Sequence, residues 1–251
     1  MLPASSTESG PAGGYPPRVK SYGQFCPIAQ AMEVLGERWT ILVVRELLCG
    51  SRRFNDLSRG VPLMSRTMLS QRLKSLESSG VVARRERRDR SGNGTEYELT
   101  PAGQALRPIV EGCGVWASRW LRRDPNPEEL DAALLMWDVR RNIDVGALPD
   151  RDVLVQFFFP DAGRGKTRFW LHLKRFEVDL CLTHPGFDVD LEVEASLLTM
   201  TRVWMGMRSL KQAIQSRELR LSGDRRWRDQ LPRWLKLSPF ASPGAPARGK
   251  P

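Results

Sequence analysis

The sequence predicts an α+β chain with two folded domains, covering residues 22–124 and 125–238. The spacing of apolar residues is helical up to about residue 79 and alternates from residue 81, which indicates helices followed by strands. Two prolines in the segment 124–127 interrupt the chain near its middle and favour a domain junction there. The chain has 251 residues, of which 41% are hydrophobic, so it is long enough to bury two cores of ordinary size.

Both ends of the chain are rich in proline, glycine and serine. We expect a disordered leader over residues 1–21 and a disordered tail over residues 239–251. The leader lacks the apolar stretch of a secretory signal. No apolar run approaches the roughly 20 residues that span a bilayer. The sequence therefore predicts a cytoplasmic protein with no membrane partner.

Four helices are predicted in the first domain before residue 80. Pro27 suits the first turn of the first helix, Ser65 is a plausible N-cap of the fourth, and Gly80 closes it. The predicted helices cover residues 27–35, 37–50, 54–61 and 66–79. The apolar stripe of the fourth helix is formed by Leu69, Leu73 and Leu76.

A β-hairpin is predicted next, because apolar and polar residues alternate over 81–88 and again over 95–99. The connection 90–94 contains glycine and asparagine, which suit positive φ angles in a tight turn. Thr100 and Pro101 then begin a long helix, which we expect to continue to about Arg122.

The second domain is predicted to be a layered α+β domain. Asn126, Pro127 and Glu129 are typical residues for the beginning of a helix. The predicted helices cover residues 128–142, 195–204, 207–217 and 224–235. The predicted strands cover residues 152–159, 167–174, 176–182, 188–194 and 218–222.

The order of elements in the first domain is that of a winged helix-turn-helix module. Because leucines hold the fourth helix against its neighbours, the opposite face points outward, and short polar side chains there can reach base edges in the major groove. A plain solvated helix face is the alternative, since any surface helix is polar outside. The residues expected to contact bases are Ser65, Arg66, Thr67, Ser70, Gln71 and Lys74.

Basic residues gather in this region: residues 45–90 contain twelve Lys or Arg and five Asp or Glu. Five arginines within seven positions of the hairpin would repel one another on an exposed ribbon unless an anion were present. This predicts double-stranded DNA as the partner, with phosphate or minor-groove contacts from the hairpin. The residues expected to make them are Arg52, Arg53, Arg84, Arg85, Arg87, Arg88, Arg90 and Asn93.

The segments GERWTILVVRELLCGSRRFNDLSRGVPLMSRTMLSQRLKSLESSGVV and EYELTPAGQAL closely resemble the HxlR-type branch of bacterial winged-helix transcription regulators, over about residues 22–120. The family pattern is met in order by Gly36, Trp39, Thr40, Arg53, Phe54, Leu57, Leu69, Arg72, Leu73, Leu76, Glu77, Tyr97, Leu99, Thr100 and Gly103. The resemblance implies a homodimer that binds palindromic operator DNA, with terminal helices of this domain paired between subunits.

Three further residues take an expected role from this resemblance. Trp116 and Trp120 lie one helical turn apart and are the anchors expected in the dimer interface, unless they are buried within the same chain. Cys26 lies where several members of the family keep a redox-sensing cysteine. A buried structural cysteine is the alternative, because the neighbouring sequence supplies no basic residue beyond a helix N-terminus.

The second domain resembles the sterol-carrier-protein-type-2 fold, in which a curved, mostly antiparallel sheet and covering helices enclose an apolar tunnel. The likeness depends on the element order and on the pattern Trp204-x-Gly206-x-x-x-Leu210-x-x-Ala213-Ile214. It implies an apolar small-molecule effector, or a dimerisation role. The expected ligand contacts are Leu198, Val203, Trp204, Met205 and Met207. The alternative is that these apolar residues belong to the hydrophobic core and contact no ligand.

Enzyme chemistry is not predicted, because the chain has no glycine-rich phosphate loop, nucleophile elbow or clustered Cys and His. The four cysteines are widely spaced and the two histidines isolated, so we expect no metal and no cofactor. The function predicted is a dimeric DNA-binding transcription regulator, with the C-terminal domain as the candidate sensor of an apolar small molecule. A carrier of lipids or apolar ligands with non-specific polyanion binding is the alternative.

Overall fold

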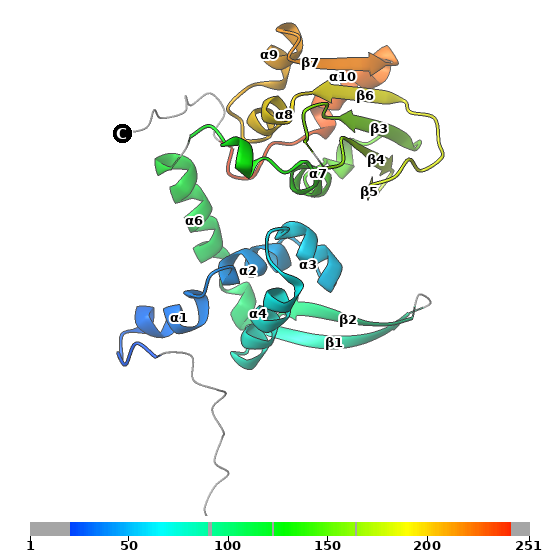
Figure 1. The fold of residues 1–251 in the computed structure, drawn as a ribbon. Coiled ribbons are helices and arrows are strands. Elements are labelled where there is room, and N and C mark those ends of the chain that lie inside the picture. Colours follow the sequence, from blue (N-terminus) through cyan, green and yellow to red (C-terminus); the bar gives the residue numbers. More distant parts are fainter. Residues whose placement is uncertain (1–20, 90–91, 122, 164, 242–251) are drawn as a thin grey trace, which may run out of the picture.

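The computed structural model describes residues 21–89, 92–121, 123–163 and 165–241. Figure 1 shows the first helices and a long hairpin at one end of the molecule and a larger sheet with its helices at the other. Helix α6 runs between these two ends (Figure 1). The predicted leader up to residue 20 and the predicted tail from residue 242 lie outside the described residues.

The N-terminal part folds as a winged helix-turn-helix. Its helices are α1 (Pro27–Leu35), α2 (Thr40–Leu48), α3 (Phe54–Gly60), α4 (Arg66–Ser78), α5 (Pro101–Gln104) and α6 (Arg107–Trp120). Its two strands, β1 (Val82–Asp89) and β2 (Gly92–Leu99), pair antiparallel with Val82 opposite Leu99. The hairpin is longer than predicted, because its second strand begins at residue 92. A hydrophobic core of residues from α2, α3, α4, the hairpin and α6 holds this part together.

The predicted single helix from residue 100 to about residue 122 is instead two helices. Thr100 caps α5 by accepting a hydrogen bond at Oγ1 from the Gly103 backbone N–H, at 3.2 Å. Pro108 lies in the first turn of α6. It has no N–H to donate to the carbonyl of Gln104, where α5 ends. The proline therefore favours a new helix start over continuation of α5.

The C-terminal part is a mixed five-stranded sheet with helices. Its helices are η1 (Pro127–Glu129), α7 (Ala132–Arg141), η2 (Val145–Ala147), α8 (Leu197–Trp204), α9 (Leu210–Gln215) and α10 (Arg225–Trp234). Its strands are β3 (Val153–Phe158), β4 (Arg168–Lys174), β5 (Glu177–Cys181), β6 (Leu191–Ala195) and β7 (Leu219–Gly223). The strand order is β5-β4-β3-β6-β7, and only the β3–β6 pair is parallel.

One face of this sheet packs on helices and forms the second core. Val155 and Phe157 of β3 lie opposite Leu191 and Val193 of β6, and all four side chains are almost fully buried. Residues from α7, α8, α9 and α10 complete the same cluster. This core shares no residue with the core of the helix-turn-helix part.

Residues 237–241 return to the junction between the two parts. The Ser238 N–H donates to the Trp204 carbonyl at 2.9 Å. A Cβ on Gly114 of α6 would lie 2.4 Å from the Phe240 ring, so the absence of a side chain at Gly114 allows this contact. Three residues of the expected tail, 239–241, are therefore ordered against the body of the protein.

No helix within the described part of the chain combines the length and the apolar character needed to cross a bilayer.

Candidate nucleic-acid interface

Helix α4 presents a polar face outward over a leucine stripe. Leu69, Leu73 and Leu76 are each 1% exposed and hold the helix on the domain core. The Ser65 hydroxyl oxygen accepts from the Met68 N–H at 3.2 Å, which fixes the beginning of the helix. The predicted base-contacting residues Thr67, Gln71 and Lys74 are exposed, and Ser70 is half-buried.

Arg66 is oriented at the beginning of α4 by helix α3. Its guanidinium donates two hydrogen bonds to the side-chain oxygen of Asn55, at 3.2 and 3.3 Å, and lies 4.7 Å from the centre of the Phe54 ring. The neighbouring arginine on the same helix, Arg72, points back instead and donates to the Arg38 carbonyl and to Glu37. Arg66 is therefore held on α3 with its side chain exposed, whereas Arg72 attaches α4 to the turn before α2.

Two of the five hairpin arginines, Arg85 and Arg87, have counter-charges that the expectation of mutual repulsion did not include. Glu96 of β2 lies between Arg53 and Arg87, at 3.5 and 3.0 Å, and Arg85 pairs with Glu98 at 3.0 Å. The antiparallel register causes this arrangement, because it places Glu96 opposite Arg85 and alternate residues on one face. The three arginines nevertheless remain 54–70% exposed.

These ion pairs do not prevent phosphate binding by the hairpin. Exposed pairs of this kind contribute about 0–1 kcal/mol, so a phosphate can replace a glutamate at small cost. Arg84 is exposed on the opposite face of the hairpin from Arg85 and makes no ion pair within the described chain. Arg88 and Asn93 belong to the strands, but their side chains are not described, and Arg90 lies outside the described residues.

The segment before α3 joins the hairpin sheet. The Tyr97 N–H donates to the Arg52 carbonyl at 2.8 Å, and Arg53 forms a bridge with Glu96. Arg52 is half-buried, with one buried guanidinium nitrogen that has no partner in the described chain. The backbone thus brings Arg53 beside the hairpin, at the end of the molecule that also carries α4 (Figure 1).

Helices α1 and α6 expose large apolar side chains. Trp116 and Trp120 of α6 are 56% and 51% exposed, so the alternative that they are buried within the chain is not what the structure shows. Next to α1, Phe25 is 96% exposed, and Ile28 in its first turn is also largely exposed.

Cys26 immediately precedes α1 and is half-buried. The backbone N–H groups of Ala29 and Ile28, at the beginning of the helix, lower the pKa of its thiol. Cys181 in the sheet behaves in the opposite way, because burial raises the pKa of its thiol. The helix N-terminus therefore favours the thiolate at Cys26.

A polar cluster joins the two parts of the chain, and we call Arg45, Glu46, Asp138 and Arg141 the junction cluster. Glu46 of α2 is fully buried and accepts two hydrogen bonds from Arg141 of α7, at 2.9 and 3.0 Å. Nη2 of Arg45 donates to both carboxylate oxygens of Asp138, at 2.9 and 3.0 Å, and Asp138 also pairs with Arg141. Trp137 donates to Glu46 at 3.4 Å.

The junction cluster depends on a close approach between α2 and α3. A Cβ on Gly60 would lie 1.9 Å from the Glu46 carboxyl carbon, so any larger residue would displace the carboxylate. Arg59 also stacks 5.4 Å from the Trp137 ring. Sequence reasoning missed the cluster because Glu46 and Arg141 are 95 residues apart and Glu46 lies in an otherwise apolar helix.

The expected ligand contacts of the second domain pack mostly as core. Val203 is fully buried and Trp204 is 8% exposed, while Leu198, Met205 and Met207 are half-buried. None of the five lines the groove between α9, β7 and α10. Val203 and Trp204 thus belong to the core, as in the alternative stated for them, and Met205 packs against it.

The comparisons with known proteins match the N-terminal part. The sequence profile described as "HxlR-like helix-turn-helix" matches residues 34–125. The chain is 39% identical over 104 residues to the "Uncharacterized HTH-type transcriptional regulator YvaP" of Bacillus subtilis, which covers 41% of this chain and 94% of that protein. It is 32% identical over 96 residues to the "HTH-type transcriptional regulator YodB" of the same organism, covering 38% of this chain and 85% of the relative.

Among solved structures, the reduced form of YodB from Bacillus subtilis matches with 32% identity and a TM-score of 0.35. The match covers 39% of this chain and 95% of that chain.

Proposed function

The chain belongs to the HxlR-like helix-turn-helix family of transcription regulators, and from this premise we propose that it binds palindromic operator DNA as a homodimer. One observation carries the proposal: the outward polar face of α4 and the arginine-bearing hairpin lie together at one end of the molecule (Figure 1). DNA binding follows from the family, whereas the dimer, the operator and the effector are our inference.

In this proposal α4 enters the major groove and the hairpin follows the backbone. Gln71 and Thr67 reach base edges, and each good bidentate contact contributes roughly 1–3 kcal/mol of discrimination. Arg66 is exposed at the beginning of α4 and held on α3 by Asn55, at the flank of this face. Phosphate contacts from the hairpin arginines set the register of the protein on the duplex without reading the sequence.

The exposed apolar residues of α1 and α6 support a dimer. Trp116 and Trp120 project from a helix that leads away from the DNA-binding end, so a second copy can cover them without covering α4 (Figure 1). A twofold pairing would present two copies of α4 to DNA and would require half-sites about 10 bp apart, or a multiple of that distance.

We further propose that the sterol-carrier-like C-terminal domain senses a small molecule and passes the signal through the junction cluster. Glu46 and Arg45 lie on the helix that packs against α3 and α4, whereas Asp138 and Arg141 lie on α7 of the second domain. An effector regulates DNA binding only if it binds the competent and incompetent arrangements with different affinities. A junction of this kind supplies the physical connection that such coupling requires.

A redox role for Cys26 is a second part of the proposal. The observation that favours it is the lowered pKa of its thiol at the helix N-terminus, next to the exposed apolar residues of α1. Oxidation there would add bulk or a crosslink beside the proposed dimer surface.

The test is a competition binding assay with the duplex upstream of the protein's own gene. We expect this duplex to bind at least about a thousandfold more tightly than random duplex at the same salt concentration. Gln71→Ala should relax the preference by roughly 1–3 kcal/mol, whereas Gln215→Ala, at the far end of the molecule, should not change it. Equal affinity for both duplexes would favour the carrier alternative.

A further inference from the structure

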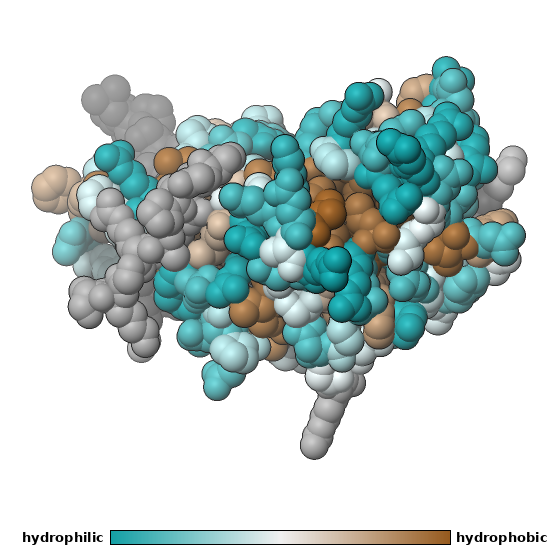
Figure 2. Space-filling view, turned by 90° about the horizontal axis from the view of Figure 1, so that it is seen from above, coloured by the Kyte–Doolittle hydropathy of each residue, from teal (hydrophilic) through white to brown (hydrophobic). Residues whose placement is uncertain are grey.

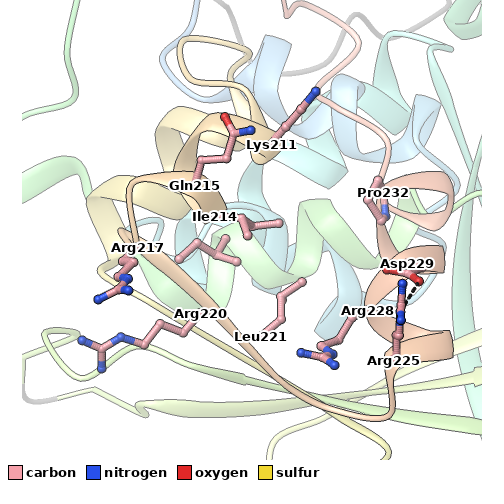
Figure 3. Close-up of a pocket in the computed structure, with 11 residues that line it drawn as sticks. Lys211, Ile214, Gln215, Arg217, Arg220, Leu221, Arg225, Arg228, Asp229 and Pro232 are labelled. Atoms are coloured by element: carbon pink, nitrogen blue, oxygen red, sulfur yellow. Dashed lines mark ion pairs between the residues drawn. The ribbon is translucent and has the colours of Figure 1, made fainter.

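A groove opens between α9, β7 and α10 in the second domain. Its volume is about 930 Å³, within the roughly 300–1,000 Å³ typical of small-molecule sites. Ile214 of α9, Leu221 of β7 and Pro232 of α10 form its apolar floor (Figure 3). Figure 2 looks down on this end of the molecule and shows apolar surface in a hollow that hydrophilic residues surround.

The rim of the groove is strongly basic. Five of the lining residues are Lys or Arg, and Asp229 is the single acid. Two of the arginines are paired, Arg220 with Glu194 at 3.5 Å and Arg225 with Asp229 at 3.6 Å. The other lining cations, Lys211, Arg217 and Arg228, make no ion pair within the described part of the chain. Three positive charges therefore surround an apolar floor without counter-charges.

The two arginines without an ion pair, Arg217 and Arg228, lie at different ends of the groove. Arg217 follows α9 with φ of 60°, in the left-handed region where glycine is usual after a helix. An arginine here accepts a backbone cost that glycine would avoid. Arg228 projects from α10 toward the floor at Leu221, whereas Arg217 points outward at the other end of the groove (Figure 3).

Duplex DNA does not account for this charge. The groove elements α9, β7 and α10 lie at the opposite end of the molecule from α4 and the hairpin (Figure 1). A straight duplex held by α4 and the hairpin would therefore not contact the groove. β7 is an edge strand, and charged residues on an edge also discourage pairing with other chains. Edge protection alone, however, requires no apolar floor.

We propose that this groove binds a small amphipathic organic anion. Its apolar body lies on Ile214, Leu221 and Pro232, and its carboxylate or other acidic group pairs with Arg228. Arg217 and Lys211 raise the local concentration of the anion through their charge. This inference deepens the sensing role proposed above. The binding of the anion stands without that role, and only its effect on DNA binding rests on it. It places the ligand on the outer edge of the sheet rather than in the core around Trp204.

Calorimetric titration of the full-length protein with dodecanoate, in the absence of DNA, tests this directly. We expect one dodecanoate per chain, and we expect Arg228→Gln to weaken its binding about tenfold through the loss of one charged hydrogen bond. The matched control is Arg233→Gln, since Arg233 is exposed on the same helix but does not line the groove. Dodecanol, the neutral counterpart, should bind equally to wild type and Arg228→Gln.

A second variant and two further probes keep the outcome unambiguous. Ile214→Ser should weaken both dodecanoate and dodecanol, because it removes apolar surface from the floor. The proposal is overturned if Arg228→Gln binds dodecanoate like wild type. It is also overturned if the variant instead loses binding to phosphatidylglycerol vesicles or to random duplex DNA, which would identify a membrane or nucleic-acid surface.

The groove and the proposed regulator function can fail separately. Dodecanoate binding without operator preference would leave the groove assigned and remove the regulator proposal. Operator preference without dodecanoate binding would do the reverse.

Discussion

Glu46 is the residue on which the contact between the two parts of the chain depends. A buried carboxylate is costly unless it is paired and fully hydrogen-bonded. Here Arg141 supplies both hydrogen bonds of a bidentate pair and Trp137 a third. Burial opposes the charged form of Arg141, but hydrogen bonds to Glu46 and the charge of Asp138 more than compensate and raise its pKa. Arg141 therefore stays charged in the folded protein.

Glu46→Gln should destabilise the protein by about 3 kcal/mol, because it leaves the nearly buried Arg141 without its main counter-charge. The free energy of unfolding from urea denaturation measures this. Glu77→Gln is the matched control, since Glu77 is exposed on α4 and makes no ion pair within the described chain. A change below about 0.5 kcal/mol for Glu46→Gln, within the range of ordinary surface substitutions, would contradict the role assigned to the cluster.

Among the elements, the hairpin was predicted from the sequence in its strands but not in its ion pairs. The alternation over 81–99 predicted two strands, which are present, and exposed arginines on them, which the structure shows for Arg84, Arg85 and Arg87. The counter-charges of Glu96 and Glu98 were not predicted, because they depend on the register between strands. The strands pair with Asp89 opposite Gly92, which places Arg85 opposite Glu96, so the register itself was the missing signal.

Glu96→Gln should strengthen DNA binding severalfold at low salt, because it frees Arg53 and Arg87 from a carboxylate that competes with phosphate. Fluorescence anisotropy over a series of salt concentrations measures the effect, which should shrink as salt rises. Glu111→Gln on α6, whose partner is Arg107, is the control with an exposed pair outside the hairpin. Weaker binding by Glu96→Gln would show that the glutamate positions the arginines for phosphate.

Some of the other elements are determined by residues close together in the sequence, and others by residues far apart. The first helix has the predicted bounds, Pro27–Leu35, because Pro27 and Gly36 mark both ends within the sequence. The parallel pairing of β3 with β6 was not predicted, since strands far apart in the chain become neighbours only through the packing of the whole sheet. The junction cluster was missed for the same reason.

Helix α6 carries the proposed dimer surface. Trp116→Arg should convert the protein to a monomer, because it places a charge in the centre of an apolar contact. Sedimentation velocity measures the mass. Phe176→Arg is the matched control, since Phe176 is 79% exposed on the loop between β4 and β5. A dimer that survives Trp116→Arg would place the subunit contact elsewhere.

At the scale of the whole molecule, two further ion pairs fasten the segment between the two cores. Arg123 pairs with Glu129, and Arg202 of α8 makes a bidentate contact with Asp124, at 2.8 and 2.9 Å. The hydrogen bond from Arg123 is the main cause that lowers the pKa of Glu129 to about 2. Arg202 likewise lowers the pKa of Asp124. These pairs restrain the chain where it passes from α6 to α7.

The pH dependence of stability should report this restraint. A carboxyl group whose pKa is lowered by folding stabilises the folded protein at pH values above its usual pKa, which is 4.5 for Glu129. That contribution is lost as the pH falls toward the folded-state pKa of about 2. The difference in unfolding free energy between wild type and Glu129→Gln should therefore be constant above about pH 5 and decrease below it. Glu128→Gln, at a neighbouring residue without an ion pair in the described chain, should show no such decrease.

The central claim is that α4 and the hairpin form one surface that grips a duplex, with the basic groove of the second domain outside it. Hydrogen–deuterium exchange of the full-length protein, with and without the duplex upstream of its gene, tests the claim most directly. We predict added protection in peptides covering residues 66–78 and 82–99 and none in peptides covering residues 210–234. Protection confined to residues 210–234, or absent from both hairpin and α4, would contradict the account.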